Sequence, residues 1–366
     1  MVIGIPREIK PEEKRVSATP EGVRVLVRHG HQVIVEQKAG MGCGISDDAF
    51  RKAGGSITGS SVAVWGKADM ILKVKEPIVS EFPLMRKNQI IFTFLHLAAK
   101  KKLTVTLLKK KVVGIAYETV QLEDGNLPIL RTMSEVAGRL SAQLGARGLE
   151  IQNGGRGILV GGAKGVSPAQ VTVLGGGNAG LRAAEVASGM GAMVTMLEVN
   201  RRRVDKLRKF FNNRVVVKHS TPVSVEGEVV KADVVIGAVL NPGAKAPKLI
   251  TRNLVKKMKK GAVIVDIAVD QGGCCETIRP TTHAHPFYTV YKVVHCGITN
   301  LPSTVSLTST LALTRASLPY VLEIADKGYL LAAKENPAIG KGINVVDGKL
   351  TNRAVAEAFG LTYYKV

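Results

Sequence analysis

Three glycines in the segment "VTVLGGGNAGLRAAEVASGMGAMVTMLEVN" (171–200) have the spacing of a phosphate-binding turn. Gly175, Gly177 and Gly180 fit the pattern G-x-G-x-x-G, between a predicted strand and a predicted helix. The following strand ends in a carboxylate, Glu198, which lies 18 residues after Gly180. In such a unit the glycines allow a tight turn, a close approach to the pyrophosphate and close helix packing, while the acid receives the ribose hydroxyls. The pattern therefore predicts a dinucleotide site, with the phosphates at the helix N-terminus.

The residue types around Glu198 bear on which dinucleotide binds. A carboxylate accepts hydrogen bonds from the ribose hydroxyls and repels a 2′-phosphate, which favours NAD over NADP. Arg201, Arg202 and Arg203 follow directly, and arginines there can receive a 2′-phosphate. We expect NAD.

A second segment, "VIVDIAVDQGGCCET" (263–277), places two carboxylates four residues apart in an apolar run. In an extended strand Asp266 and Asp270 would point to the same side. A buried carboxylate is costly unless it is paired or hydrogen-bonded. We expect a central strand that ends at the crevice where open α/β sheets bind ligands, with Asp270 at its exit. We expect Asp266 to be structural and hydrogen-bonded to neighbouring backbone.

Three polar side chains follow predicted strands in the first third of the chain: Arg15, Lys75 and His96. A guanidinium suits a planar carboxylate, and an imidazole can transfer protons near neutral pH. Their spacing alone favours simpler interpretations: a surface arginine, a charged strand end and a hydrogen-bonded core histidine.

The elements that carry these residues alternate between strands and helices, which favours α/β layers with parallel sheets. A helix over 19–30 should begin at a Thr19 cap and stop at Gly30. Two long helices are expected near 132–145 and 310–329, with an irregular glycine-rich stretch at 153–169. Strands are expected at 1–6, 31–37, 68–77, 88–97, 112–120, 232–239 and 261–269.

These elements predict two Rossmann-like, doubly wound α/β domains joined by long helices. Residues 1–130 plus 305–366 should form a discontinuous substrate domain, and 131–304 an inserted NAD-binding domain. The chain has 366 residues and is 45% hydrophobic, enough for two cores. Because the opening residues lack an apolar stretch and no apolar run approaches membrane length, we expect a soluble, cytoplasmic protein.

The four cysteines form no CxxC pair, so we expect neither a metal site nor a disulfide framework. We expect them to be buried free thiols. The net charge of +22 comes from the runs at 100–111, 201–209 and 256–260. Aromatic residues make up only 4%, so stacking platforms for nucleic acid are scarce. We expect no specific nucleic-acid partner, only weak, salt-sensitive association with acidic polymers.

Several motifs, in order along nearly the whole chain, resemble the alanine dehydrogenase family. They are "GIPREIKPEEKRVSATP", "LKVKEP", "FTFLHLA", "MSEVAGRLSAQLGA", "DIAVDQGGCCETIRPTTH" and "TSTLALTRASLPYVLEIADKGY". The resemblance implies NAD-dependent, reversible oxidative deamination of L-alanine to pyruvate and ammonium. It also implies a homohexamer. The family usually has Asp where this chain has Glu198, which should alter the geometry but keep the preference for NAD.

The resemblance also implies roles for individual residues. Arg15 matches the residue that binds the substrate carboxylate, and Lys75 the one that contacts the carboxylate or keto oxygen. His96 and Asp270 match the catalytic histidine and aspartate. Besides the glycines and Glu198, the residues matched to cofactor contacts are Ser134, Asn178, Ala179, Arg203, Ser220, Val239, Leu240, Ile267, Ala268, Val269, Asp270, Arg279, Ile298, Thr299, Asn300 and Leu301.

Three other interpretations fit parts of the sequence. The soluble NAD-binding subunit of proton-translocating transhydrogenase resembles the same fold, but it carries a different sequence where this chain has "MSEVAGRLSAQ". A lysine-forming saccharopine dehydrogenase shares the architecture more distantly and needs room for a longer side chain. A non-catalytic, basic nucleic-acid-associating protein would explain the charge, but it leaves Arg15, Lys75, His96 and Asp270 without a purpose.

Overall fold

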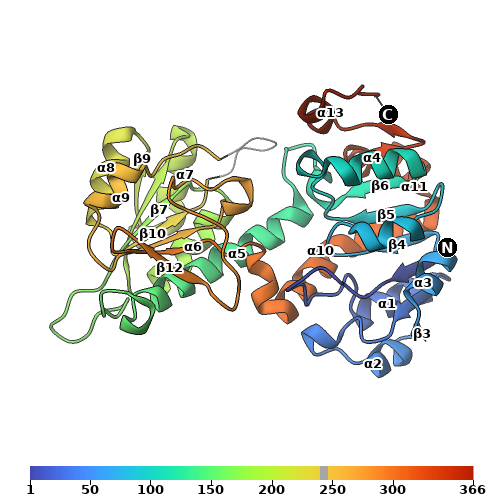
Figure 1. The fold of residues 1–366 in the computed structure, drawn as a ribbon, viewed down its shortest axis with the longest axis horizontal. Coiled ribbons are helices and arrows are strands. Elements are labelled where there is room, and N and C mark those ends of the chain that lie inside the picture. The colour runs from blue at the N-terminus through green and yellow to red at the C-terminus, as the bar shows by residue number, and fades with distance from the viewer. Residues whose placement is uncertain (240–245, 366) are drawn as a thin grey trace. The chain divides into compact units, whose positions relative to one another are not determined.

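A computed structural model describes residues 1–239 and 246–365. The chain divides into two compact units, drawn with their elements in Figure 1. The first unit comprises Met1–Met133 and Val305–Val366, and the second comprises Ser134–Thr304. Each unit is built around its own twisted sheet and is described by itself.

The first unit contains, within the described residues, an eight-stranded sheet in the order β15-β14-β6-β5-β4-β1-β2-β3. The strands from β3 to β6 pair in parallel, and β14 and β15 add an antiparallel edge beside β6. The strands are β1 (Val2–Ile5), β2 (Gln32–Glu36), β3 (Ser56–Thr58), β4 (Met70–Leu72), β5 (Ile90–Thr93), β6 (Val113–Ala116), β14 (Ile343–Val346) and β15 (Lys349–Leu350).

Helices cover this sheet, and α1 shows how the sequence starts and stops one. The Thr19 side chain accepts a hydrogen bond from the Gly22 amide, Pro20 is the first helical residue, and Gly30 follows the end at a φ of +83°. The predicted cap, start and stop of this helix are confirmed. The helices are α1 (Pro20–Arg28), α2 (Asp47–Lys52), α3 (Ser61–Lys67), α4 (Lys101–Lys110), α10 (Ser306–Lys327), α11 (Tyr329–Glu335), α12 (Pro337–Gly342) and α13 (Arg353–Phe359).

The second unit contains a seven-stranded sheet in the order β12-β13-β11-β10-β7-β8-β9, again within the described residues. All pairs are parallel except β12 with β13. The strands are β7 (Gln170–Leu174), β8 (Met193–Glu198), β9 (Val216–His219), β10 (Val234–Gly237), β11 (Val263–Asp266), β12 (Phe287–Val290) and β13 (Val293–Cys296). The helices are α5 (Pro128–Gly148), α6 (Asn178–Gly189), α7 (Arg201–Phe211), α8 (Pro222–Lys231) and α9 (Arg252–Lys257).

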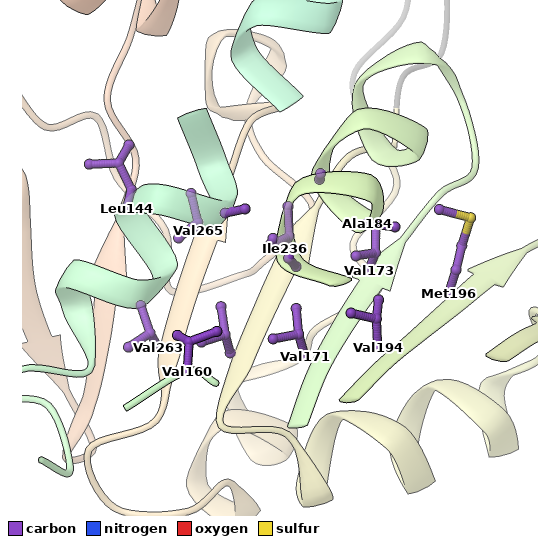
Figure 2. Close-up of a cluster of buried hydrophobic side chains, with 14 of the residues drawn as sticks. Leu144, Val160, Val171, Val173, Ala184, Val194, Met196, Ile236, Val263 and Val265 are labelled. Atoms are coloured by element: carbon purple, nitrogen blue, oxygen red, sulfur yellow. The ribbon is translucent and has the colours of Figure 1, made fainter. Parts of the chain in front are cut away.

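Valine and alanine predominate in the core of the second unit, which also contains larger side chains such as Leu144 and Met196 (Figure 2). Val171, Val173 and Ile236 lie on adjacent strands and are at most 3% exposed. Strands buried on both faces carry continuous apolar runs, and each buried Val or Ile contributes about 1.5–3 kcal/mol of transfer free energy. This pattern made the strands recognisable in the sequence.

Helix α5 approaches the second sheet through three glycines. A Cβ at Gly138 would lie 2.1 Å from the Ala179 carbonyl oxygen, and Cβ atoms at Gly145 and Gly148 would lie 2.6 and 2.7 Å from valine methyl groups of β10 and β11. Side chains at these positions would push the helix away. The glycine stripe therefore fixes how closely α5 packs on the nucleotide-binding turn.

The fold prediction is confirmed: the chain is α/β with two parallel-dominated sheets and two Rossmann-like domains. One detail is wrong, because the strand predicted over 261–269 ends at Asp266 and Asp270 lies in a 3₁₀ turn, Val269–Gln271. The two carboxylates therefore do not share the side of one strand. No helix in the described part of the chain is long and apolar enough to cross a membrane.

Candidate functional site

The glycine turn between β7 and α6 has the geometry that a dinucleotide requires. Gly175 has a φ of +96°, a conformation that favours glycine, and a Cβ at Gly180 would lie 1.9 Å from the Gly175 carbonyl oxygen. A Cβ at Gly177 would meet no heavy atom within 4 Å. Gly177 therefore borders open space at the N-terminus of α6, where no side chain caps the first helical amides, those of Asn178 and Ala179, and such a terminus can bind a phosphate.

Glu198 closes the same turn from the end of β8. It is buried, and its Oε2 accepts a hydrogen bond from the Gly176 amide at 2.8 Å while Oε1 accepts one from the Asn200 amide at 2.8 Å. Arg203 on α7 donates from Nε to the Gly176 carbonyl oxygen at 2.5 Å. The turn is thus held between an acid and a base, each of which also has hydrogen-bonding capacity for a ligand.

Two of the other residues that the resemblance matches to cofactor contacts, Ser220 and Val239, lie beside this turn. The Ser220 amide donates to the Glu198 carbonyl oxygen at 2.9 Å, directly after β9. Val239 follows β10, and one of its methyl groups lies 3.1 Å from where a Cβ on Gly175 would stand. Ser134 is on α5. Leu240 lies outside the described residues.

The loop after β11 contains both aspartates of the second motif. Asp266 is 1% exposed and accepts hydrogen bonds from the backbone amides of Ala268, Cys274 and Cys275. The prediction that backbone groups bind this carboxylate is confirmed. Burial raises its pKa, outweighing the opposite effect of those bonds. Asp270 is exposed, whereas Ala268 and Val269 beside it are buried and Ile267 is half-buried.

Arg279 is held by Tyr288 near this loop. The Arg279 guanidinium lies 4.4 Å from the centre of the Tyr288 ring, and its amide donates to the Tyr288 hydroxyl at 2.7 Å. The Tyr288 hydroxyl donates in turn to the Thr277 carbonyl oxygen at 2.9 Å. The segment after β13 continues with buried Ile298, half-buried Thr299 and Asn300, the last at a φ of +60°, and buried Leu301.

Arg15, in the first unit, is paired with an acid from its own loop. Its Nε and Nη2 donate to the two carboxylate oxygens of Glu13 at 2.7 and 2.6 Å, and Nη1 lies 3.1 Å from the Met133 sulfur. Arg15 is 2% exposed, so it is not a surface arginine, the alternative that its spacing allowed. A cavity of about 350 Å³ beside the loop is lined by residues that include Arg15, Glu13 and Lys38.

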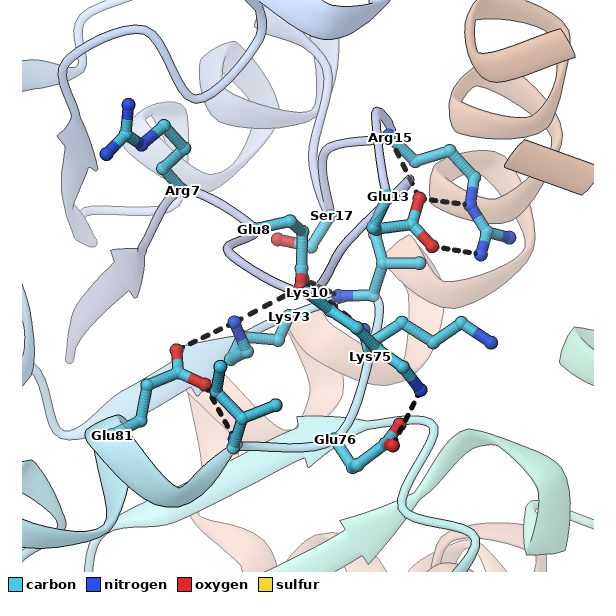
Figure 3. Close-up of polar contacts among 12 residues, drawn as sticks. Arg7, Glu8, Lys10, Glu13, Arg15, Ser17, Lys73, Lys75, Glu76 and Glu81 are labelled. Atoms are coloured by element: carbon cyan, nitrogen blue, oxygen red, sulfur yellow. Dashed lines mark hydrogen bonds and ion pairs between the residues drawn. The ribbon is translucent and has the colours of Figure 1, made fainter. Parts of the chain in front are cut away.

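Lys75 follows β4, and its backbone is held by a buried acid from the loop after β1. Glu8 Oε1 accepts hydrogen bonds from the amides of Val74 and Lys75 at 2.5 and 3.3 Å. Its Oε2 lies 3.1 Å from Lys73 Nζ, which also binds Glu81 at 2.8 Å (Figure 3). Two carboxylates and one ammonium therefore share the interior beneath Lys75.

The charge around the Lys75 ammonium destabilises its protonated form. Burial lowers the pKa of Lys75, and the nearby cations Arg15 and Lys10 lower it further. Lys10 is itself paired with Glu76 at 2.7 Å, an interaction drawn in Figure 3. Lys75 therefore lies beside two cations that are each paired with a glutamate, Arg15 with Glu13 and Lys10 with Glu76.

His96 follows β5 in a left-handed conformation, with a φ of +48° and a ψ of +41°. Its ring stacks on Phe94 with the planes 5° apart, and its side chain is 42% exposed. Glu118, after β6, accepts the His96 amide at 2.6 Å and lies 3.8 Å from the ring Nδ1. His96 is therefore not a core histidine, because its ring reaches solvent.

The structure brings the first-unit residues to one edge of one sheet. Arg15, Lys75 and His96 follow β1, β4 and β5, which are adjacent and parallel, so all three lie beyond their carboxyl ends. Asp270 and the nucleotide-binding turn belong to the second unit. The residues that hold these side chains and the glycine turn in place were not predicted from the sequence. They are Glu8, Glu13, Lys73, Glu81, Glu118 and Gly138.

Comparisons with known proteins agree with this arrangement. The alanine dehydrogenase/PNT N-terminal domain family matches residues 4–137, and the C-terminal domain family matches residues 141–353. Alanine dehydrogenases of Methanococcus maripaludis and Staphylococcus saprophyticus are each 52% identical, over 99% of this chain and 98% of theirs.

Solved structures show the same fold. An L-alanine dehydrogenase superposes with a TM-score of 0.95 at 47% identity, covering 98% of this chain and 99% of that one. A transhydrogenase from Sinorhizobium meliloti superposes with a TM-score of 0.82 at 22% identity, over 96% of this chain and 100% of that one. The second likeness shows the fold alone.

Proposed function

The chain belongs to the alanine dehydrogenase/PNT family, and we infer from this that it catalyses the reversible oxidative deamination of L-alanine to pyruvate and ammonium. The observation that carries the proposal is the 52% identity to alanine dehydrogenases over 99% of the chain. The conformation of the glycine turn supports a nicotinamide dinucleotide as the second substrate.

The residues of the glycine turn fit that cofactor. Gly177 borders the open space that a pyrophosphate needs, and the N-terminus of α6 supplies amides for it. We propose NAD as the cofactor, because Glu198 accepts ribose hydroxyls and repels a 2′-phosphate. Arg203, Ser220, Val239, Leu240 and Ser134 are proposed as contacts of the adenosine and phosphate groups. Ile267–Asp270, Arg279 and Ile298–Leu301 are proposed as contacts near the nicotinamide.

A nicotinamide held by the residues proposed above would supply the acceptor or donor of the hydride, and the protein's own side chains would orient the substrate and move protons. Arg15 is proposed to bind the substrate carboxylate, with Glu13 fixing the plane of its guanidinium. Lys75 is proposed to hold the substrate oxygen and, as an ammonium, to polarise the keto group when ammonia adds to pyruvate.

The proton transfers are proposed for Asp270 and His96. After hydride loss, the imine of pyruvate must be attacked by water, and the resulting carbinolamine must release ammonia. A carboxylate can take the proton from the attacking water and return one to the leaving nitrogen. We assign both steps to Asp270. His96, exposed and stacked on Phe94, is proposed to exchange a proton with the substrate oxygen.

Assembly and location follow the family expectation. We propose that the protein acts in the cytoplasm as a homohexamer. Light scattering at physiological ionic strength tests the assembly, and a mass corresponding to one chain would contradict it.

The decisive experiment measures formation of reduced nicotinamide from L-alanine with NAD and with NADP. We expect turnover with NAD, and turnover with neither cofactor would overturn the proposed activity. Asp270→Asn should lower kcat by about 10²- to 10⁴-fold, to a rate that can still be measured, while NAD still binds. Asp48→Asn, an exposed carboxylate on α2, is the matched control and should retain full turnover. Full turnover in Asp270→Asn would refute only the role given to Asp270.

A further inference from the structure

The buried carboxylate of Asp266 ties together both ends of the loop that contains Asp270. Its Oδ1 accepts the Ala268 amide at 3.0 Å, on the way into the loop. Its Oδ2 accepts the amides of Cys274 and Cys275 at 2.7 and 3.0 Å, on the way out. One side chain therefore closes a ring of backbone around residues 267–275.

The loop has further fixed points inside that ring. The amides of Gln271 and Gly273 both donate to the Ala268 carbonyl oxygen, at 2.8 and 2.9 Å, and the Gly272 amide donates to the Val269 carbonyl oxygen at 3.0 Å. Gly272 and Gly273 have φ values of +88° and +71°. The turn that carries Asp270 is thus hydrogen-bonded on itself.

The space around Asp266 leaves little room for another arrangement. A Cβ on Gly273 would lie 2.8 Å from Asp266 Oδ2, and a Cβ on Gly237 would lie 2.3 Å from the Cys274 sulfur. The neighbouring Cys274 stays a neutral thiol, because burial and the Asp266 charge both raise its pKa. The ring is therefore closed by a single charged acceptor in a close-packed site.

We propose that Asp266 is a positioning residue for Asp270, a proposal that rests on the proton-transfer role given to Asp270 above. A single carboxylate satisfies three amides and so fixes the start and end of the loop, which leaves Asp270 exposed at a defined place. A proton-transfer group must lie within hydrogen-bond reach of its target, and a displacement of about 1 Å can cost on the order of a hundredfold in rate.

The test compares Asp266→Asn in two backgrounds, the parent protein and Asp270→Asn. An amide in place of the carboxylate directs an N–H at one or two of the three donors, so the ring opens on one side. In the parent we expect kcat to fall by about 10- to 100-fold, while KM for alanine, which Arg15 and Lys75 are proposed to bind, stays unchanged. In the Asp270→Asn background we expect no further fall, because the positioned group is already gone.

Asp233 offers a matched control in the same sheet. It is 5% exposed, accepts the Gln170 amide at 2.8 Å and pairs with Lys259 at 2.9 Å, but it lies at the amino end of β10, opposite the end where Asp270 lies. Asp233→Asn should lower thermal stability and leave kcat unchanged. This control separates positioning from a general loss of buried hydrogen bonds.

Hydrogen exchange on the parent protein tests the ring without a variant. The amides of Ala268, Cys274 and Cys275 should exchange far more slowly than those of an exposed loop. If Asp266→Asn does not fold, Asp266→Glu takes its place in both backgrounds. It keeps the charge for the three amides but is one methylene too long, so the same loss of kcat is expected.

Three outcomes would overturn the proposal: an unchanged kcat in the Asp266 variant, an equal fall in both backgrounds, or rapid exchange of the three amides. Failure of the underlying function is distinguishable. If Asp270→Asn retains full turnover while the amides are protected, the role of Asp270 is wrong although the ring exists. If Asp270→Asn is slowed as expected and the Asp266 variant is unaffected, only the positioning proposal is wrong.

Discussion

Lys73 Nζ lies 3.1 Å from Glu8 Oε2 inside the first unit, where both side chains are almost fully buried. Burial alone would lower the pKa of Lys73, but Glu8 and Glu81 together outweigh it and raise that pKa. The ammonium is therefore held charged between two carboxylates. Through the bonds from Glu8 to the amides of Val74 and Lys75, this buried group supports the segment that carries Lys75.

Replacing Lys73 with Met should destabilise the protein by about 3–5 kcal/mol, because it leaves two buried carboxylates without a cation. Urea unfolding measures this loss. Lys52→Met, which removes an exposed pair with Asp48 at 3.8 Å, should cost less than about 1 kcal/mol. A loss of similar size in both variants would contradict the assigned importance of the buried ammonium.

The same variant predicts a dependence of stability on pH. Burial already raises the pKa of Glu8, and Lys73 is the charge that opposes this rise. Without Lys73 the folded state should bind a proton at Glu8 more tightly than the unfolded chain does. Its stability should therefore increase as the pH falls from neutrality toward the ordinary carboxyl range, and decrease as the pH rises again. Thermal unfolding over that range, compared with the parent, measures the change.

The lowered pKa of Lys75 predicts an alkaline limit for pyruvate binding. The ammonium should lose its proton below the ordinary lysine value of 10.5, so kcat/KM for pyruvate should fall as the pH rises through the lowered pKa. Lys75→Arg keeps the charge to higher pH, and its alkaline limb should move upward. Lys100→Arg, on an exposed lysine, serves as the control. An unmoved limb in Lys75→Arg would assign the titration to another group.

Gly177 and Gly180 should respond differently to alanine. At Gly180 a Cβ overlaps the Gly175 carbonyl oxygen, so Gly180→Ala should destabilise the protein by about 1–3 kcal/mol and abolish cofactor binding. At Gly177 the Cβ enters open space, so stability should change by less than about 0.5 kcal/mol. Its NAD affinity should nevertheless fall by about tenfold, or ~1.4 kcal/mol. Calorimetric titration measures the NAD affinity of each variant, and thermal unfolding measures its stability. An unchanged affinity in Gly177→Ala would place the pyrophosphate elsewhere.

Glu198 should determine the preference between NAD and NADP. Glu198→Gln removes the charge that repels a 2′-phosphate, while Arg203 and its neighbours remain. The ratio of kcat/KM for NADP to that for NAD should rise by about tenfold. Glu226→Gln, an exposed acid paired with Lys257, should leave the ratio unchanged. If the ratio stays constant in Glu198→Gln, the carboxylate acts only on the turn through the Gly176 amide.

Local patterns predicted the nucleotide-binding turn well, because its constraints lie within a few residues. Gly175 and Gly180 are fixed by backbone conformation and by contact inside one turn, which a glycine spacing records directly. The cap and stop of α1 are local in the same sense. The apolar run "VIVDIAV" predicts a strand that continues to Val269. In the structure the strand ends at Asp266, whose carboxylate accepts hydrogen bonds from the amides of Cys274 and Cys275.

The supporting residues could not be predicted from spacing, because their partners are distant in the chain. Glu8 lies 65 residues from Lys73, and Gly138 lies 41 residues from Ala179. Glu13 is only two residues from Arg15, yet nothing in "EEKRVS" distinguishes a buried ion pair with two hydrogen bonds from a solvent-exposed one. Such contacts exist only once the sheet has brought the loops together.

Helix α7 places positive charge beside the glycine turn, since its sequence "RRRVDKLRKFF" contains six cations and one acid and its Arg203 binds the Gly176 carbonyl oxygen. The proposed cofactor carries the negative charge of its pyrophosphate in both oxidation states, so these cations should attract the oxidised and the reduced form alike. Added salt screens that attraction, so the affinity for the cofactor should fall as the ionic strength rises.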